Sequence, residues 1–360
     1  MNTFSFPELS NQNFVGRDFV FTAINDFIHR YPKGYLTIVG VPGSGKSAIL
    51  AQLVRQNPDI IYYNAQVPGK NRVEEFFKDV CPQLDSLFST PPQPSPQGRR
   101  EIEIVNANEG SWLFSNLLQQ VSERLSPENH LIIIIDGLDG VDINSQAAGT
   151  NLFYLPRYLP NQVYFIFARR PYQRSHSGLL IEAPSQVLDL SDFPEENRED
   201  VREFLRSHLT TETQSSPRNI IELINENEDN FMYVQQILTA FTEGFYDEHD
   251  VNEVPPGLQV YYQQLWDKMQ GDGLSDVAVN LLRVLTAGKM QLLSILDISK
   301  AINEDVFDIM EVLEGWLEFL QVISTGKEVK YQLYHYGFRK WLKQSGSVSD
   351  ICTAKVGDDI

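Results

Sequence analysis

The sequence predicts an α/β protein: a doubly wound parallel sheet, followed by a helical subdomain and a winged-helix subdomain. Three observations predict it. In the first half of the chain, short apolar runs of the length of buried strands alternate with stretches of helical spacing. A glycine-rich loop follows the first of these runs. After residue 190 the pattern becomes helical, and strand-like runs return only near the end of the chain.

The predicted sheet is built from apolar runs that read as parallel strands with helices between them. Helical spacing predicts helices over 72–88 and 109–125, separated by the proline-rich segment "STPPQPSPQG". Its PxxP pattern is compatible with a ligand of a proline-binding domain, but we favour a plain surface loop. The expected strands cover residues 35–39, 60–64, 131–135, 163–168 and 187–190.

The second half of the chain is predicted to be mainly helical. Asp192 offers a helix cap, with Glu195 three positions on. The helical pattern continues through "NIIELINENEDNFMYVQQILTAF" until the prolines and glycine of "EVPPGLQVYY" interrupt it. From Ser275, three short helices precede two strand-like runs around a Gly-Lys turn, which is the order of a winged helix.

Length and composition limit the class of protein. A chain of 360 residues exceeds one ordinary core, so two or three subdomains are expected. The formal charge of −19 disfavours broad binding to nucleic acid, because phosphate contacts depend on Lys and Arg. The isolated Cys81 and Cys352 suit a reducing compartment. With no signal peptide and no apolar run of membrane-spanning length, we expect a soluble cytoplasmic protein.

The glycine-rich loop is the clearest functional motif. Gly40 to Ser47 satisfies GxxxxGK[ST], between an apolar strand and a helical stretch. In such a P-loop the backbone N–H groups surround the β-phosphate, Lys46 reaches the β and γ oxygens, and Ser47 ligates Mg²⁺. This predicts a P-loop NTPase, with ATP or ADP and Mg²⁺ as cofactors, since no [NT]KxD guanine motif is present. The expected nucleotide contacts are Val41, Pro42, Gly43, Ser44, Gly45, Lys46, Ser47 and Ala48.

Acidic and basic residues follow the next two apolar strands. Asp136 ends "LIIIID" and is predicted to hold Mg²⁺ with Ser47. Asp139 is near enough to orient or deprotonate an attacking water, although a surface turn would also explain Asp139 and Asp142. Arg170, after the following strand, could contact the γ-phosphate and report its presence, and the alternative is a solvated pair with Arg169.

Together these motifs resemble the STAND signal-transducing P-loop ATPases, in particular their NACHT-like branch, over residues 12–345. "NFVGRD" resembles the family's entry motif, which implies that Phe14, Val15 and Arg17 lie near the adenine and phosphates. The family's D-G-x-D-E motif appears with Gly140 in place of the glutamate, which implies weak hydrolysis. "ARRP" replaces the family's T-S-R-P, so Arg170 takes the sensor position.

The resemblance extends to the second half of the chain. It implies that Phe231, in "DNFMYVQQIL", lies close to the adenine. "VPPGLQVYYQQL", with Tyr261, resembles another family segment, and both aromatics are also explained as core residues. "YQLYHYGFRKWL" resembles the winged-helix histidine motif, which implies that His335 contacts the β-phosphate in an inactive ADP-bound form. A histidine among aromatics can also be packed structurally.

The resemblance implies a slowly hydrolysing signalling switch in defence or programmed death, in which nucleotide exchange drives opening and self-association into a homo-oligomer. Relatives carry effector and sensor domains around this core. This sequence has neither, so it represents a core fragment, a degraded paralogue or one member of a system with a separate effector or sensor protein. We expect a P-loop nucleotide-binding domain over 1–190, a helical domain over 191–270, a winged-helix domain over 271–345 and a flexible tail over 346–360.

Two alternatives remain open at this level. One is a winged-helix ATPase that acts on DNA, but residues 275–343 hold 8 Lys and Arg against 9 Asp and Glu, a net charge of 8 − 9 = −1. The other, motivated by Gly140, is a scaffold that binds nucleotide without hydrolysing it. The basic residues that could line a wing are Lys327, Lys330, Arg339, Lys340 and Lys343.

Overall fold

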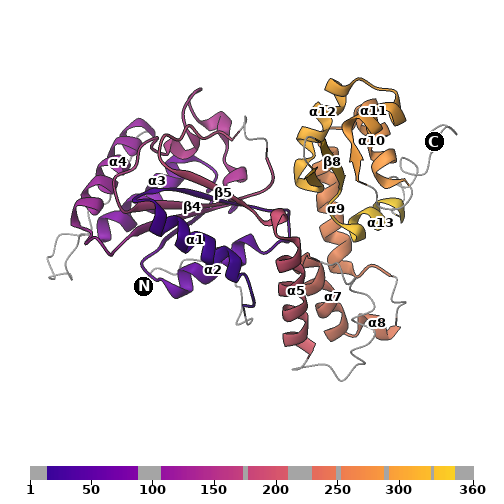
Figure 1. Ribbon diagram of the computed structural model, residues 1–360, viewed down its shortest axis with the longest axis horizontal. Helices are drawn as coiled ribbons and strands as arrows, with labels where there is room; N and C mark the ends of the chain where they lie inside the picture. The colour runs from indigo at the N-terminus through magenta and orange to yellow at the C-terminus, as the bar shows by residue number, and fades with distance from the viewer. Residues whose placement is uncertain are drawn as a thin grey trace. The chain divides into compact units, whose positions relative to one another are not determined.

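The computed structural model describes residues 14–87, 107–172, 177–209, 229–248, 253–287, 292–325 and 328–344. The chain divides into two units (Figure 1). The described residues of the first unit run up to Gly40, from Gly45 to Arg170, and from 177 to Asp200. The remainder, including the short segment Val41–Ser44, belongs to the second unit. The expected proline-rich loop and C-terminal tail lie outside the described residues.

The first unit contains a five-stranded parallel sheet in the order β2-β3-β4-β1-β5, which confirms the predicted α/β class. In this order β4 lies between the strand that precedes the glycine-rich loop and the strand that ends at Asp136. The carboxyl ends of all three therefore meet at one edge. The strands are β1 (Gly34–Val39), β2 (Ile61–Asn64), β3 (Leu131–Asp136), β4 (Val163–Arg169) and β5 (Ser185–Asp189).

Helices cover both faces of this sheet (Figure 1). Successive strand residues point to opposite faces, so Ile134 packs with α1 (Asp18–Arg30) and α2 (Lys46–Gln56), whereas Ile133 and Ile135 pack with the other pair of helices. That second pair is α3 (Val73–Ser86) and α4 (Ala107–Arg124). Two apolar layers thus hold the sheet rigid beneath its carboxyl edge.

The transition into α5 (Pro194–Leu209) differs from the prediction in detail. Asp192 ends the 3-10 turn η5 (Leu190–Asp192), and the residue before the helix is Phe193, so the predicted N-cap at Asp192 was one residue early. The last strand also ends one residue before the predicted limit. The reason is that Asp189 accepts a hydrogen bond from the Ser191 amide and so starts the turn directly after β5.

The second unit has its own apolar core, built from helices and a small antiparallel sheet of order β6-β8-β7. Three of its helices follow a Ser or Asp whose side chain accepts a backbone N–H, as expected of N-caps. These residues are Ser275, Ser294 and Asp305. The two-residue strand β6 (Leu293–Ser294) was not expected, because it is too short to produce an apolar run. The domain limits stay predictions.

In the second unit, the three short helices and the two strands predicted after Ser275 are present in that order. No helix in the described part of the chain is long and apolar enough to cross a membrane. The helices are α7 (Phe231–Thr242), α8 (Phe245–Glu248), α9 (Pro256–Gln270), α10 (Asp276–Thr286), α11 (Ile295–Ile302), α12 (Val306–Gly315) and α13 (Tyr336–Gln344). The longer strands are β7 (Leu320–Thr325) and β8 (Glu328–Leu333).

Candidate nucleotide-binding site

The glycine-rich loop joins β1 to α2, as the motif predicts. Gly43 and Gly45 have φ values of 83° and 87°, a region that L residues with side chains rarely adopt. These two glycines let the chain turn tightly and direct it into the N-terminus of α2, where unpaired N–H groups favour an anion. The amine of Lys46 donates to the carbonyl oxygen of Gly40 at 2.6 Å, so the lysine folds back over its own loop.

The electrostatic environment of Lys46 shows which charged residues gather at this loop. Burial lowers the pKa of the Lys46 amine to about 8. Asp139 and Asp136 oppose this shift, whereas Arg170 and Arg17 add to it. Four of the predicted site residues, from three separate parts of the sequence, are therefore close enough to Lys46 to affect its charge.

Asp136 is placed to hold a divalent cation with Ser47. It is the last residue of β3, 3% of its surface is exposed, and its carboxylate forms a hydrogen bond with the Ser47 side chain. Burial raises the pKa of Asp136, and the hydrogen bonds from Ser47 and Tyr62 partly oppose this. A hydroxyl and a carboxylate side by side form a donor set that fits Mg²⁺, which prefers oxygen ligands. When bound, Mg²⁺ would neutralise charge on the phosphates.

Asp139 and Arg170 form a pair. The backbone N–H of Arg170 donates to Oδ1 of Asp139 at 3.0 Å, and its Nε lies 3.5 Å from Oδ2. Both carboxylate oxygens of Asp139 thus have a contact with Arg170. Asp142 instead accepts the amide of Asn144 at 3.1 Å in a surface turn, which is the role proposed as the alternative to catalysis.

Arg169, the extra charge that the sequence left unexplained, has a structural environment. Its side chain is 6% exposed, and Nη1 donates to the carbonyl oxygen of Ser177 at 2.9 Å. Arg169 therefore holds the segment after β4 close to the strand. The two adjacent arginines have different contacts: Arg169 donates to Ser177, and Arg170 contacts Asp139.

The entry motif is anchored to α5. Arg17 is 2% exposed and has a φ of 66°, in the left-handed region that is costly for a residue with a side chain. Its backbone N–H donates to Asp200 at 3.1 Å, its Nε lies 3.7 Å from the same carboxylate, and Nη1 donates to Asn197. Phe14 packs edge-on against Phe21, and Val15 is half-buried.

In the second unit, the loop segment Val41–Ser44 is held by the start of α7. Asn230 is 2% exposed, and its Nδ2 donates to the carbonyl oxygen of Pro42 at 2.9 Å. The N–H of Met232 donates to the carbonyl oxygen of Gly43 at 3.3 Å. A side chain on Gly43 would collide with Asn230, so this glycine is required by a close approach as well as by its φ. Ala48, which belongs to the first unit, lies in the first turn of α2.

The other predicted residues of the second unit lie among aromatic neighbours. Phe231 packs against Phe204 at 5.5 Å between ring centroids. His335 is 4% exposed; its Nδ1 accepts the N–H of Phe338 at 3.3 Å, which caps the start of α13. The hydroxyl of Tyr262 lies 3.2 Å from the same nitrogen. The proposed nucleotide contacts of Phe231 and His335 stay predictions.

Several residues of the site were missed by sequence reasoning. Asn230 was the easiest of them to predict, because an asparagine directly before an apolar helical run is an N-cap signal. For the others the sequence carried no signal, since their partners depend on strand order and on the path of α5. They are Tyr62, Asn64, Asn197 and Asp200.

Comparison with known proteins concerns the family and the fold of the chain. Residues 13–167 match the family described as AAA ATPase domain. A Walker-type ATPase of Pyrococcus abyssi has a similar structure, with a TM-score of 0.60, 15% identity, and coverage of 92% of this chain and 96% of that chain. A search of curated proteins gave no match.

Two further solved structures are more distant. Cdc6p from Pyrobaculum aerophilum covers 96% of both chains at 11% identity with a TM-score of 0.43. A structure of Drosophila ORC bound to DNA covers 87% of this chain and 91% of that chain at 13% identity with a TM-score of 0.29. Likeness at such identities concerns the fold alone, and we base nothing on these two. The family match indicates a P-loop ATPase domain over residues 13–167, and the first likeness supports its fold.

Proposed function

We propose that the protein is a slow ATPase that works as a nucleotide-dependent signalling switch of the STAND type, with ADP holding a resting form and ATP an active one. The observation that carries the proposal is the pair formed by Asp139 and Arg170 beside Lys46. The scaffold alternative differs from this proposal because it would leave the γ-phosphate uncleaved. The other alternative differs because its partner would be DNA.

The pair explains how hydrolysis would be both slow and sensitive to the γ-phosphate. A carboxylate that already accepts two contacts from Arg170 is a poor acceptor for the proton of a water. A γ-phosphate would compete for the guanidinium, because charge-assisted hydrogen bonds to phosphate are strong. Arg170 would then release Asp139 only when ATP is bound, so one residue would report the phosphate and permit its cleavage.

Gly140, the residue after Asp139, also supports slow turnover. The family's motif has a glutamate at this position, and here there is no side chain. A Cβ on Gly140 would lie 3.2 Å from the carbonyl oxygen of Ala65, closer than most such contacts. A side chain at this position would require the neighbouring backbone to shift, and Asp139 is the acidic residue that we propose for orienting the attacking water.

Release of phosphate from ATP by the purified protein tests this proposal. We expect slow Mg²⁺-dependent release by the wild type, none above background by Lys46→Ala, and a decrease of about 100-fold for Asp139→Asn, a typical contribution of a general base. Asp142→Asn is the matched control, because Asp142 caps a surface turn three residues away, and its rate should equal that of the wild type.

If the wild type releases no more phosphate than Lys46→Ala, the protein is a non-hydrolysing scaffold and the ATPase proposal is wrong. Mass spectrometry of the nucleotide released on denaturation adds a test of the switch. Stoichiometric ADP in the purified protein would support a resting form, and an empty site would contradict it.

The switch requires that nucleotide contacts differ between two states of the protein. A change from mostly closed to mostly open requires about 5.5 kcal/mol of differential binding. A Mg²⁺-diphosphate with several charge-assisted hydrogen bonds can supply this. We propose that Phe231 and His335 add contacts in the ADP form, and that their loss on exchange leads to opening and self-association. A role in defence or programmed death, with a separate effector or sensor, belongs to the same proposal.

The DNA-binding alternative is disfavoured by the chemistry of α12. If residues 271–345 form a winged helix, α12 is the second helix of the helix-turn-helix pair, the one that enters the major groove in DNA-binding members. Residues 304–318 carry six acidic side chains and no Lys or Arg. Such a helix would repel phosphates. Salt-sensitive retardation of DNA by the protein would revive this alternative.

A further inference from the structure

Tyr62 is a half-buried link between the second strand and the predicted magnesium site. Its hydroxyl donates to Oδ2 of Asp136 at 3.1 Å, across two adjacent parallel strands. The Ser47 side chain also forms a hydrogen bond with the same carboxylate, and the tyrosine bond fixes one of its oxygens. Because Asp136 is 3% exposed, water cannot easily replace this donor if it is lost.

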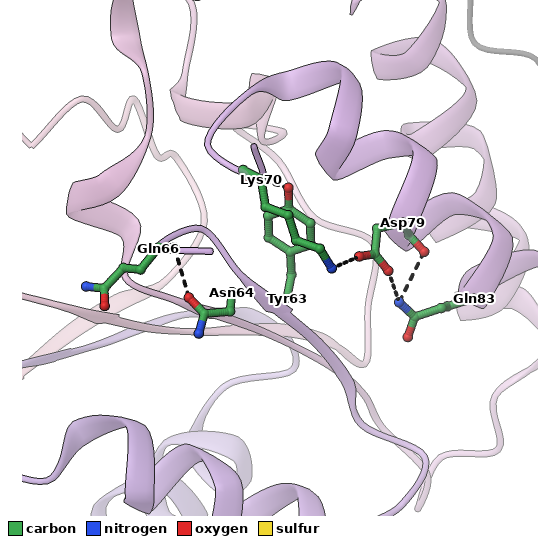
Figure 2. Close-up of polar contacts among 6 residues, drawn as sticks. All are labelled: Tyr63, Asn64, Gln66, Lys70, Asp79 and Gln83. Carbon is green, nitrogen blue, oxygen red and sulfur yellow. Dashed lines mark hydrogen bonds and ion pairs between the residues drawn. The ribbon is translucent and has the colours of Figure 1, made fainter. Parts of the chain in front are cut away.

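The hydroxyl of Tyr62 is itself held in place. The Asn64 side chain forms a hydrogen bond with it. Asn64 is oriented in turn by the backbone N–H of Gln66, which donates to its Oδ1 at 2.9 Å, as Figure 2 shows. With its oxygen used in this way, Asn64 has its NH₂ group for the tyrosine, and the tyrosine proton is directed to Asp136.

The same segment is fixed to the end of β3 by the main chain. The N–H of Ala65 donates to the carbonyl oxygen of Asp136 at 2.9 Å. Gly137 has a φ of 69°, and a Cβ there would collide with the Gln66 side chain. The turn after β2 and the turn after β3 thus pack closely, and the chain from Gln66 through Asn64 and Tyr62 ends on the carboxylate.

From this arrangement we infer that Tyr62 is a positioning residue for Mg²⁺: its hydroxyl, set by Asn64, orients the Asp136 carboxylate so that one oxygen and the Ser47 hydroxyl face the cation together. The inference rests on the proposed nucleotide site. Hydrogen bonds from the second layer around a metal ligand fix its direction, and their loss typically lowers metal affinity by about 10–100-fold.

Tyr63 provides a matched control on the same strand. Its hydroxyl donates to the carbonyl oxygen of Lys70 at 2.5 Å, and the Lys70 amine lies 5.6 Å from its ring centroid and 2.6 Å from Asp79 (Figure 2). Tyr63 packs with the α3 and α4 layer, whereas Tyr62 packs with the α1 and α2 layer. Tyr62→Phe and Tyr63→Phe remove the same oxygen from opposite faces of β2.

The experiment is a titration of a fluorescent ATP analogue into the full chain, with Mg²⁺ varied and with EDTA as the metal-free condition. Tyr62→Phe should raise the Mg²⁺ concentration for half-maximal enhancement of binding by about tenfold. Its affinity in EDTA should equal that of the wild type. Tyr63→Phe should leave both quantities unchanged, and Asn64→Ala should shift the Mg²⁺ requirement in the same direction as Tyr62→Phe but by less.

Each remaining outcome is decisive. Equal Mg²⁺ requirements for Tyr62→Phe and Tyr63→Phe overturn the inference, as does a loss of affinity for Tyr62→Phe that is equally large in EDTA. Thermal unfolding without nucleotide checks that the variants fold; if Tyr62→Phe does not, the response of Asn64→Ala decides. A wild type that binds the analogue without any Mg²⁺ effect overturns this inference alone, whereas one that binds no analogue also removes the proposed function.

Discussion

At the scale of single residues, Arg17 is the most constrained position of the site. Its backbone is left-handed, which costs about 1–3 kcal/mol for a residue with a side chain and persists where the surroundings hold it. Asp200 does so through two contacts, one to the backbone N–H and one to the guanidinium, and Asn197 adds a third. Arg17 is also close enough to Lys46 to add to the lowering of its pKa, of which burial is the main cause.

Replacement of Asp200 tests this constraint. Asp200→Ala removes the acceptor of a strained amide and leaves the buried Arg17 charge with fewer contacts, so we expect a loss of about 2–4 kcal/mol in the free energy of unfolding. Urea denaturation measures it. Asp26→Ala, at an exposed position of α1, is the control and should change stability by less than about 0.5 kcal/mol. Equal stabilities for the two variants would show that Asp200 does not hold Arg17.

At the scale of elements, the N-terminus of α7 combines two tasks. Asn230 accepts the amide of Tyr233 at 3.0 Å, which caps the helix, and donates to Pro42 of the glycine-rich loop at 2.9 Å. A helix cap and a loop contact thus depend on one side chain whose acceptor and donor have separate partners.

Two substitutions separate these tasks. Asn230→Ala should lose both and cost about 1–2 kcal/mol of stability. Asn230→Asp keeps a capping acceptor but has no donor for Pro42, so stability should fall less while the loop amides exchange with solvent faster. Urea denaturation and hydrogen exchange measure the two effects. Identical exchange of the loop amides in Asn230→Asp and the wild type would contradict the loop contact.

At the scale of the whole molecule, the proposed switch predicts a change of assembly with nucleotide. We expect the protein to be monomeric with ADP and larger with a non-hydrolysable ATP analogue, because exchange removes contacts of the resting form. Light scattering measures the mass in solution. His335→Ala should shift the equilibrium toward the larger species in ADP, by loss of the proposed phosphate contact.

The control for this prediction is His335→Asn, which retains an acceptor able to cap α13, the contact that His335 makes with the Phe338 amide. Suppose that both variants assemble in ADP and that His335→Asn is as stable to heat as the wild type. The assembly then results from loss of the imidazole and not from loss of the helix cap. An unchanged mass in all nucleotides would contradict the switch.

Much of the fold and part of the site could be predicted because their signals are local. Buried parallel strands are short apolar runs, so all five were found to within two residues. The glycine-rich loop is recognisable because a phosphate cradle requires glycines and a lysine at set spacing. β6 was missed because a strand of two residues produces no alternating pattern in the sequence. The start of α5 was missed because sequence patterns do not locate a helix cap to within one residue.

By itself, the sequence determined the α/β class, the phosphate loop and the acidic and basic residues at the strand ends, since each depends on neighbours within a few positions. The tertiary structure alone decided which of these residues meet. Arg17 and Asp200 are 183 positions apart, and Tyr62 and Asp136 are 74 apart. Such contacts follow from strand order and helix packing, in which the stability of the whole core selects the partners of each side chain.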